Sequence, residues 1–315
     1  MCGTVINKFR GDVEIFLPGL TQLEELTGVP VLGVVPYFKD IYIPEEDSPS
    51  ERETAVDSEA VLDIAVIALP HISNFDDFDP LSRESGVGVR YVRTARELGT
   101  PDLVVIPGTK STMADLSYLR TQGLAEGITR LAAQEVAVIG ICGGYQMLGT
   151  SLRDLEHVES TVAEEDGLGL LPVVTEFTAG KQTDQVTGTV AANIGLLAGA
   201  RGVAFEGYEI HMGHSVGEGG SHPEPVLSLM RKTVSGGGVD DGCVSRDGWT
   251  LGAYVHGLFH NGDVRRTILR NLAGRKGVVL PLADDVFSQS AEYDKLADRI
   301  RDSLDIGAVY KAAAL

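Results

Sequence analysis

The chain has few cysteines, few aromatic residues and no long apolar run. Its 315 residues include three cysteines, Cys2, Cys142 and Cys243, whose odd number and wide spacing argue against a disulfide framework and for a reducing compartment. No uninterrupted apolar stretch reaches the roughly 18 residues that a membrane helix needs, and the first residues lack the basic region and cleavage site of a signal peptide. We therefore expect a cytoplasmic protein that does not cross a membrane.

Basic residues are scarce relative to acidic ones. The 26 lysines and arginines compare with 45 aspartates and glutamates, which gives a net charge of −19. Nucleic-acid binding needs a basic face, so this charge balance argues against nucleic acid as a partner. A phosphate loop that would cradle ATP is missing as well, because the pattern G-x-x-x-x-G-K-[ST] does not occur.

The strongest positive signal is a cysteine set among glycines, Gly-Ile-Cys-Gly-Gly-Tyr-Gln over residues 140–146. It follows the apolar run Val136–Ile139, which predicts a buried strand, a tight turn and then a helix. A helix N-terminus favours a thiolate and offers free N–H groups. We therefore predict Cys142 as a nucleophile and the N–H of Gly143 as half of an oxyanion hole. The alternative, a cysteine that only packs in the core, needs no glycine elbow.

Seven histidines could serve as the base, and His256 is the best placed of them. It ends the short apolar run Gly-Ala-Tyr-Val-His-Gly-Leu-Phe over residues 252–259, and catalytic groups gather at strand ends of parallel sheets. A hydrogen-bonded core histidine is the alternative, and the sequence leaves open what orients the ring. His211 and His214 form a second cluster, but beyond Glu209 they lack a further ligand at suitable spacing, so we predict no metal site.

A second loop also suits acyl chemistry. The apolar run Asp102–Ile106 predicts a strand, and Pro-Gly-Thr-Lys-Ser-Thr over residues 107–112 then opens a helix. Gly108 could lend a second N–H to an oxyanion. An ordinary strand-to-helix turn is compatible with the same spacing.

Together these motifs resemble the class I glutamine amidotransferase domain of the cobalamin-pathway amidases. The cysteine elbow, the Pro-Gly-Thr-Lys-Ser-Thr loop and Tyr-Val-His-Gly-Leu-Phe over residues 254–259 carry the resemblance. Three further segments are similar to the cobyric acid synthase family: Val5–Asp12, Pro70–Leu81 and Gly207–Gly213. The resemblance covers nearly the whole chain.

That resemblance implies a reaction and roles for particular residues. The family amidates the b, d, e and g carboxylates of adenosylcobyrinic acid a,c-diamide to give adenosylcobyric acid. Glutamine supplies ammonia, and ATP with Mg²⁺ serves as co-substrate without a tightly bound cofactor. Carried over by motif, Cys142 would attack the glutamine carboxamide and His256 would shuttle the proton. Gly108 and Gly143 would hold the oxyanion, and Gln146 would help to place glutamine.

Two departures from the family pattern leave alternatives open. Many triad amidotransferases have Glu two residues after the catalytic histidine, where this chain has Leu258; the resembled subfamily lacks that Glu too. Residues 1–50 resemble only the last part of the family's ATP-binding domain, with Asn7 at a position that contacts adenine in related folds. The alternatives are a cobyrinic acid a,c-diamide synthase, a truncated non-synthesising partner, or a hydrolase that shares the elbow.

The predicted organisation has three parts joined by one linker. Residues 1–50 form the remnant of an α/β ATP-binding domain, and residues 45–60, rich in acidic residues and serine, form a linker. Residues 61–267 form an α/β amidotransferase domain with a mostly parallel sheet and helices on both faces. Residues 268–315 form a helical extension that packs on it. A missing ATP-binding segment or polypeptide, glutamine and a corrinoid polycarboxylate are the expected partners.

Overall fold

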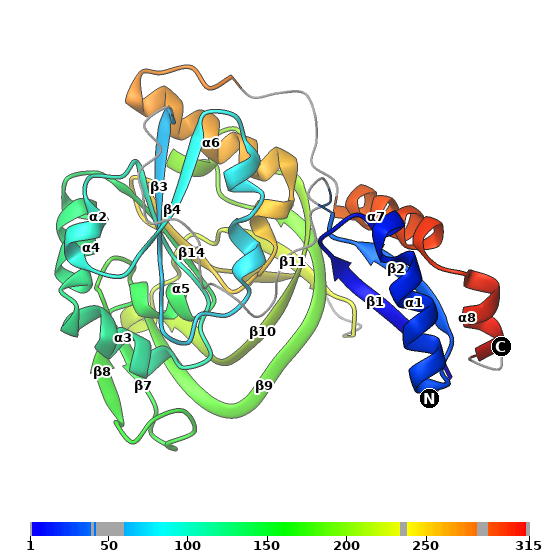
Figure 1. Cartoon of the computed structure of the whole chain (residues 1–315). Helices are drawn as coiled ribbons and strands as arrows, with labels where there is room; N and C mark the ends of the chain where they lie inside the picture. The colour runs from blue at the N-terminus through cyan, green and yellow to red at the C-terminus, as the bar shows by residue number, and fades with distance from the viewer. Residues whose placement is uncertain (1, 39–40, 42–59, 234–237, 282–288, 313–315) are drawn as a thin grey trace. The chain divides into compact units, whose positions relative to one another are not determined.

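The computed structural model describes residues 2–38, 41, 60–233, 238–281 and 289–312 (Figure 1). The chain divides into two compact units, one built from Met1–Pro44 with Phe287–Leu315 and the other from Glu45–Val286. Apart from Ala60, the predicted linker over residues 45–60 lies outside the described residues.

The first unit is a β–α–β element completed by the C-terminal helices. Its elements are β1 (Thr4–Phe9), α1 (Val13–Thr27), β2 (Val31–Pro36), α7 (Gln289–Ser303) and α8 (Ile306–Ala312). Strands β1 and β2 are parallel. Asp12 caps α1 by accepting the Glu14 N–H at 2.9 Å, and Gly28 ends the helix with a φ of 65°.

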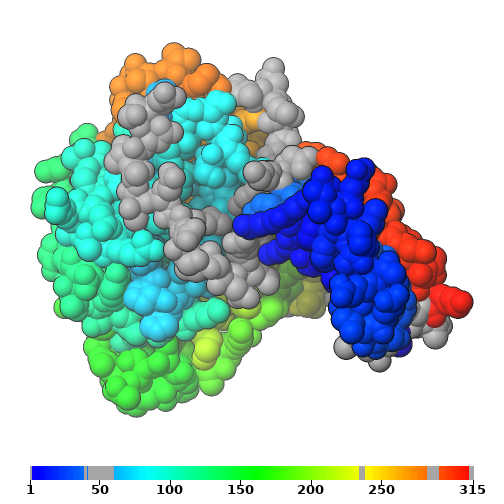
Figure 2. All heavy atoms as spheres, in the orientation of Figure 1, coloured from blue at the N-terminus to red at the C-terminus, as the bar shows by residue number. Residues whose placement is uncertain are grey.

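Helices α7 and α8 belong to this first unit, in which the red atoms of the C-terminal residues lie beside the blue atoms of the N-terminal residues (Figure 2). Leu304 forms an isolated bridge with Gly33 of β2, and the Asp305 N–H donates to the Leu32 carbonyl at 2.8 Å. A Cβ on Gly33 would lie 2.2 Å from the Ser303 carbonyl, so glycine permits this approach. The predicted extension over residues 268–315 is therefore divided. Its start belongs to helix α6 (Gly262–Lys276) of the second unit, whereas α7 and α8 belong to the first unit, and Leu304 and Asp305 between them pair with the edge of β2.

The second unit is centred on a six-stranded sheet of order β13-β14-β6-β5-β3-β4. Every neighbouring pair is parallel except β13 with β14. In chain order the strands are β3 (Leu62–Ile67), β4 (Val87–Val92), β5 (Leu103–Ile106), β6 (Ala137–Ile141), β13 (Cys243–Val244) and β14 (Thr250–Ala253). This sheet confirms the predicted α/β class with mostly parallel strands.

Each face of this sheet buries its own layer of helices. On one face lie α2 (Ala95–Leu98), α3 (Thr112–Thr121), α4 (Leu124–Ala133) and α5 (Gly143–Leu148). On the other lie α6 (Gly262–Lys276) and the short 3-10 helices η1 (Phe75–Phe78), η2 (Leu81–Arg83), η3 (Gly195–Leu197) and η5 (Leu258–His260). Helices on both faces explain why the strands are apolar throughout rather than alternating.

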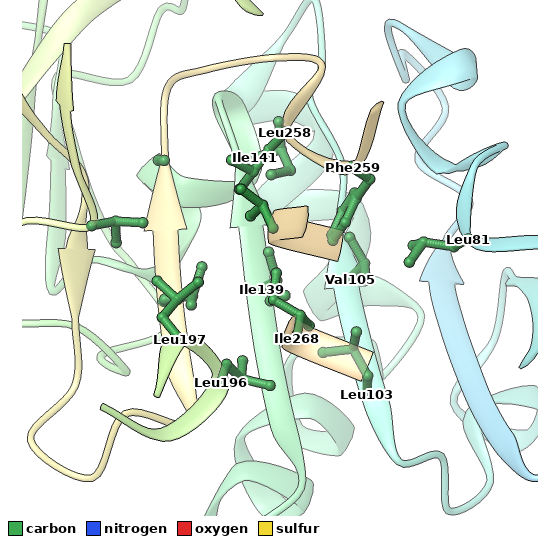
Figure 3. Close-up of a cluster of buried hydrophobic side chains, with 14 of the residues drawn as sticks. Leu81, Leu103, Val105, Ile139, Ile141, Leu196, Leu197, Leu258, Phe259 and Ile268 are labelled. Carbon is green, nitrogen blue, oxygen red and sulfur yellow. The ribbon is translucent and has the colours of Figure 1, made fainter. Parts of the chain in front are cut away.

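Alternate residues of the strands enter the two layers. Leu103 and Val105 of β5 and Ile139 and Ile141 of β6 join the cluster that contains Ile268 of α6 (Figure 3). All five are buried, and a fully buried side chain of this size contributes about 1.5–3 kcal/mol. The intervening β5 residues face the opposite layer.

A second, mostly antiparallel sheet packs beside the first. Its order is β12-β11-β9-β7-β8, with β10 paired to β9. The strands are β7 (Ser151–Arg153), β8 (Glu164–Asp166), β9 (Val173–Val190), β10 (Ala204–Gly217), β11 (Leu227–Arg231) and β12 (Val239–Asp241), and η4 (Glu218–Gly220) follows β10. Strand β10 reaches the central sheet, because Tyr208 forms an isolated bridge with His256.

Across the part of the chain that the structure describes, no helix has both the length and the apolar character needed to span a bilayer.

Candidate active site

Cys142 lies on a strained turn between β6 and α5. Its φ of 51° and ψ of −110° fall in a region that side-chain-bearing residues rarely adopt. Its N–H donates to the Ala253 carbonyl at 2.8 Å, and its carbonyl accepts the Gln146 N–H at 3.1 Å. A Cβ on Gly144 would lie 2.0 Å from the Ile106 carbonyl, so only glycine lets α5 approach the end of β5. The predicted strand, elbow and helix are therefore present at residues 137–148.

A buried histidine and carboxylate complete a triad with this cysteine. His256 follows β14, and its Nδ1 lies 2.7 Å from Oδ2 of Asp77 in η1. The other Asp77 oxygen accepts the Gly257 N–H at 2.7 Å. Both side chains are almost fully buried, His256 with 1% exposure and Asp77 with 2%. Because Nδ1 faces Asp77, Nε2 is left to interact with Cys142, which acts on the imidazole electrostatically.

The surroundings of His256 favour its charged form. Burial alone lowers the pKa of the imidazole, but the Asp77 carboxylate and the neighbouring Cys142 raise it to about 10. The ring is then an imidazolium at neutral pH, with Asp77 holding its tautomer and orientation.

An aromatic ring and a strained asparagine support the histidine from one side. Tyr208 stacks on His256 with ring centroids 5.2 Å apart and an interplanar angle of 15°. Asn74, at a left-handed φ of 56°, donates from Nδ2 to the Tyr208 hydroxyl. The backbones of Tyr208 and His256 also exchange hydrogen bonds of 2.9 and 3.3 Å. These contacts limit rotation of the imidazole.

The loop over residues 107–112 lies against the elbow. A Cβ on Gly108 would lie 2.6 Å from Cε1 of His256, and a Cβ on Gly143 would lie 3.3 Å from the Thr109 nitrogen. Among the described residues, the N–H groups of Gly108, Thr109 and Gly143 have no protein acceptor. Unpaired N–H groups beside a nucleophile are what an oxyanion hole requires.

A short β-bridge fixes the direction of the Thr109 N–H. Ile72 and Thr109 form an antiparallel bridge in which Ser73 N–H donates to Gly108 O and Lys110 N–H to His71 O. In this arrangement the bridged residues turn their own N–H groups away from each other. The Thr109 N–H therefore points away from Ile72, and the Thr109 nitrogen would lie 3.3 Å from a Cβ on Gly143. It joins the predicted Gly108 N–H as a candidate for the second oxyanion position.

Gln146 is buried and its side-chain amide is occupied by protein groups. Its Oε1 accepts the Thr112 hydroxyl at 2.9 Å, and its Nε2 donates to the Met212 carbonyl at 2.9 Å and to the Tyr254 hydroxyl at 3.3 Å. These bonds tie the elbow to α3 and β10. These contacts suit a residue that positions the elbow. They suit the predicted direct contact between Gln146 and glutamine less well.

Strand β10 covers the triad with every second residue. Tyr208 stacks on His256, the Ile210 carbonyl lies 3.7 Å from the Cys142 sulfur, and the Met212 carbonyl binds Gln146. The carbonyls of residues 208, 210 and 212 lie on the same edge of β10, because successive carbonyls along a strand point in opposite directions. They contact His256, Cys142 and Gln146 in turn.

The remaining predicted positions lie elsewhere. His211 stacks on Tyr254 with centroids 3.9 Å apart, and His214 lies 3.7 Å from Glu176. No group of three or more potential metal ligands occurs among the described residues. Asn7 lies inside β1 of the first unit, where its Oδ1 accepts the Lys8 N–H.

Sequence reasoning missed Asp77, Asn74 and Tyr208. Asp77 and His256 are 179 residues apart, so no local pattern joins them. The acidic cluster Asp76, Asp77 and Asp79, inside a segment otherwise rich in apolar residues, was the one available signal.

Comparisons with known proteins show the family of the chain. A model of the CobB/CobQ-like glutamine amidotransferase domain matches residues 63–264. Cobyric acid synthases of Dehalococcoides mccartyi and Desulfitobacterium hafniense are 43% and 44% identical over 98% and 96% of this chain. The chain spans only 60% and 59% of the length of these relatives. PurLQS from Thermotoga maritima is similar in structure at 16% identity and a TM-score of 0.49, over 68% of this chain and 99% of that one.

Proposed function

Because the chain belongs to the CobB/CobQ-like glutamine amidotransferase family, we propose that its second unit hydrolyses glutamine to glutamate and ammonia. The observation that carries the proposal is the buried series Cys142, His256 and Asp77, with unpaired N–H groups beside the sulfur. A nucleophile, a proton carrier, an orienting carboxylate and an oxyanion hole are the parts that acyl transfer needs.

In the first half-reaction, the Cys142 thiolate attacks the carboxamide carbon of glutamine and a C–S bond forms. The carbonyl oxygen becomes an oxyanion held by the N–H groups of Gly143 and the neighbouring loop. When the tetrahedral species collapses, the His256 imidazolium gives its proton to the departing nitrogen. Ammonia leaves and a γ-glutamyl thioester remains on the sulfur.

In the second half-reaction, water attacks the thioester carbonyl carbon. The neutral His256 takes a proton from that water, and the C–S bond breaks as glutamate forms. The thiolate and the imidazolium are regenerated together. Asp77 keeps its charge throughout and stabilises the imidazolium in both halves.

We propose that the ammonia serves ATP-dependent amidation of the b, d, e and g carboxylates of adenosylcobyrinic acid a,c-diamide. Identity of 43% over 98% of this chain to a curated cobyric acid synthase supports this substrate over that of cobyrinic acid a,c-diamide synthase. A separate ATP-binding segment or polypeptide is then the partner that uses the ammonia. A truncated partner that hydrolyses glutamine without synthesis remains the alternative.

The proposed hydrolysis is tested by incubating the purified chain with glutamine and measuring glutamate and ammonia. We expect the two products in equal amounts and no cleavage of peptide substrates under the same conditions. Peptide cleavage without glutamate formation would instead identify a hydrolase that shares the elbow.

The 315-residue chain by itself is expected to form no amide from ATP, Mg²⁺, ammonia and the a,c-diamide. Activation of a carboxylate by ATP needs a backbone cradle for the phosphates. The loop that most resembles one, residues 107–112, lies against the elbow and lacks the required glycine spacing. Mass spectrometry of the corrinoid distinguishes acid from amide. Amide formation by this chain without a second polypeptide would reveal a phosphate site in it.

Loss of the Tyr208 ring should slow glutamine hydrolysis moderately. A stacked aromatic pair contributes about 0.5–1.5 kcal/mol, so Tyr208→Leu is expected to lower kcat about two- to tenfold. Tyr208→Phe keeps the stack and loses only the hydrogen bond from Asn74, so it serves as the matched control. Steady-state kinetics of both variants check this; equal loss in the two would assign the effect to the hydroxyl instead.

A further inference from the structure

Asp115 is a fully buried carboxylate outside the triad. It lies in the first turn of α3, with 0% exposure, directly after the loop over residues 107–112. Its Oδ2 accepts the Thr109 hydroxyl at 2.5 Å and the His71 N–H at 3.2 Å, and its Oδ1 lies 2.7 Å from Nδ1 of His71. A buried carboxylate is costly unless such partners satisfy it, so these contacts hold one another in place.

The partners of Asp115 are the residues that shape the loop. The Thr109 hydroxyl donates a hydrogen bond to Asp115 and accepts the Ser111 N–H at 3.1 Å, so one oxygen ties the loop to the start of α3. The His71 carbonyl accepts the Lys110 N–H at 2.9 Å. The loop is thus tied to His71 and to the start of α3, and its unpaired Thr109 N–H points away from Ile72.

The Thr109 methyl group sets the separation of the two loops. A Cβ on Gly143 would lie 2.6 Å from Cγ2 of Thr109, which shows how closely the methyl packs on the elbow. The hydroxyl of Thr109 therefore holds the loop, and its methyl group keeps the loop at a fixed distance from Gly143. An oxyanion donor must lie within about 2.7–3.1 Å of the developing charge, so a small displacement of this loop weakens the interaction.

We infer that Asp115 is a positioning residue for the oxyanion hole: through the Thr109 hydroxyl and His71 it holds the Thr109 N–H opposite that of Gly143. The inference rests on the proposed glutamine hydrolysis, and it adds Asp115 and His71 as residues that position the oxyanion hole. Asp115 itself touches neither substrate nor sulfur. Its effect is confined to steps that develop negative charge on the carbonyl oxygen.

The test compares two reactions of the same sulfur. Glutamine hydrolysis passes through an oxyanion, whereas alkylation of Cys142 by iodoacetamide displaces iodide at a saturated carbon and forms none. We expect Asp115→Ala to lower kcat for glutamine about 10- to 100-fold with KM changed less than about twofold, because the lost interaction exists only in the transition state. The alkylation rate should stay within about twofold of wild type.

Thr109→Val and Thr109→Ser form a matched pair. Valine keeps the methyl that packs on Gly143 and loses the hydroxyl that binds Asp115, so kcat should fall about tenfold. Serine keeps the hydroxyl and should retain more activity than valine. Thr109→Val is close to threonine in shape, and it tests the same contact if Asp115→Ala does not fold.

The outcomes separate the inference from the function on which it rests. Lowered kcat with normal alkylation in Asp115→Ala and Thr109→Val supports the inference. Unchanged kcat in both variants, or hydrolysis and alkylation that fall in parallel, overturns it while leaving glutamine hydrolysis intact. A wild-type protein that reacts with iodoacetamide but hydrolyses no glutamine overturns the proposed function, and this inference with it.

Discussion

Replacing Cys142 with alanine should abolish glutamine hydrolysis and lower kcat by on the order of 10⁴-fold or more. No other described group supplies a nucleophile at this elbow, and the covalent route closes when the sulfur is removed. Because alanine is smaller than cysteine, the buried turn should keep its fold. Cys142→Ser keeps the size but offers a poorer nucleophile next to an imidazolium, so it should be nearly as inactive.

Cys243 offers a matched control for this substitution. Burial raises the pKa of its thiol to about 12, and its sulfur lies in β13, outside the triad. Cys243→Ala should therefore retain glutamine hydrolysis within a few-fold. When complemented with the ATP-binding polypeptide, Cys142→Ala should still use free ammonia. Retained glutaminase activity in Cys142→Ala would show that the nucleophile lies elsewhere.

Asp77→Asn should lower kcat by on the order of 10³- to 10⁴-fold, the range found when the carboxylate of a comparable triad is neutralised. The amide that replaces Oδ2 cannot hold the Nδ1 proton, so the imidazole is free to take the wrong tautomer. Asp76→Asn is the control, because Asp76 is the preceding residue and makes no hydrogen bond to His256. Glutaminase kinetics of the two variants distinguish two causes of a lower kcat. A loss in Asp77→Asn alone indicates misorientation of His256, whereas an equal loss in both indicates an effect of negative charge in η1.

The same variant makes a prediction about pH. Asp77 raises the folded-state pKa of His256 to about 10, above the value of about 6.5 expected for an unfolded chain. A raised histidine pKa adds stability that is fully present below about pH 6.5 and is lost as pH rises through about 10. The stability lost in Asp77→Asn should therefore be larger near pH 6.5 than near pH 10, measured by urea unfolding. A loss that grows with rising pH would contradict the assignment.

The local parts of the site could be predicted from the sequence. An apolar run, a glycine-flanked cysteine and a following helix are neighbours in the chain, so the elbow at Cys142 follows from spacing alone. The parallel sheet follows from the short apolar strands interleaved with helices. His256 also follows such a strand, and the carboxyl ends of parallel strands meet at one edge.

The parts that depend on tertiary contacts could not be predicted. Asp77 reaches His256 only because η1 folds over the end of the sheet. The residue type suggests Gly108 for the second oxyanion position, whereas the direction of the neighbouring Thr109 N–H depends on the bridge between Ile72 and Thr109. Division of residues 268–315 between two units depends on the pairing of Leu304 with Gly33, which helical periodicity does not reveal.

The most direct test of the account is to trap the acyl-enzyme. The chain is mixed with glutamine, quenched in acid within the first turnover, digested and examined by mass spectrometry. The account predicts a γ-glutamyl group on the peptide that contains Cys142, absent from Cys142→Ala and from the peptide that contains Cys243. Glutamine hydrolysis with no adduct on Cys142, or with the adduct on another residue, would contradict it.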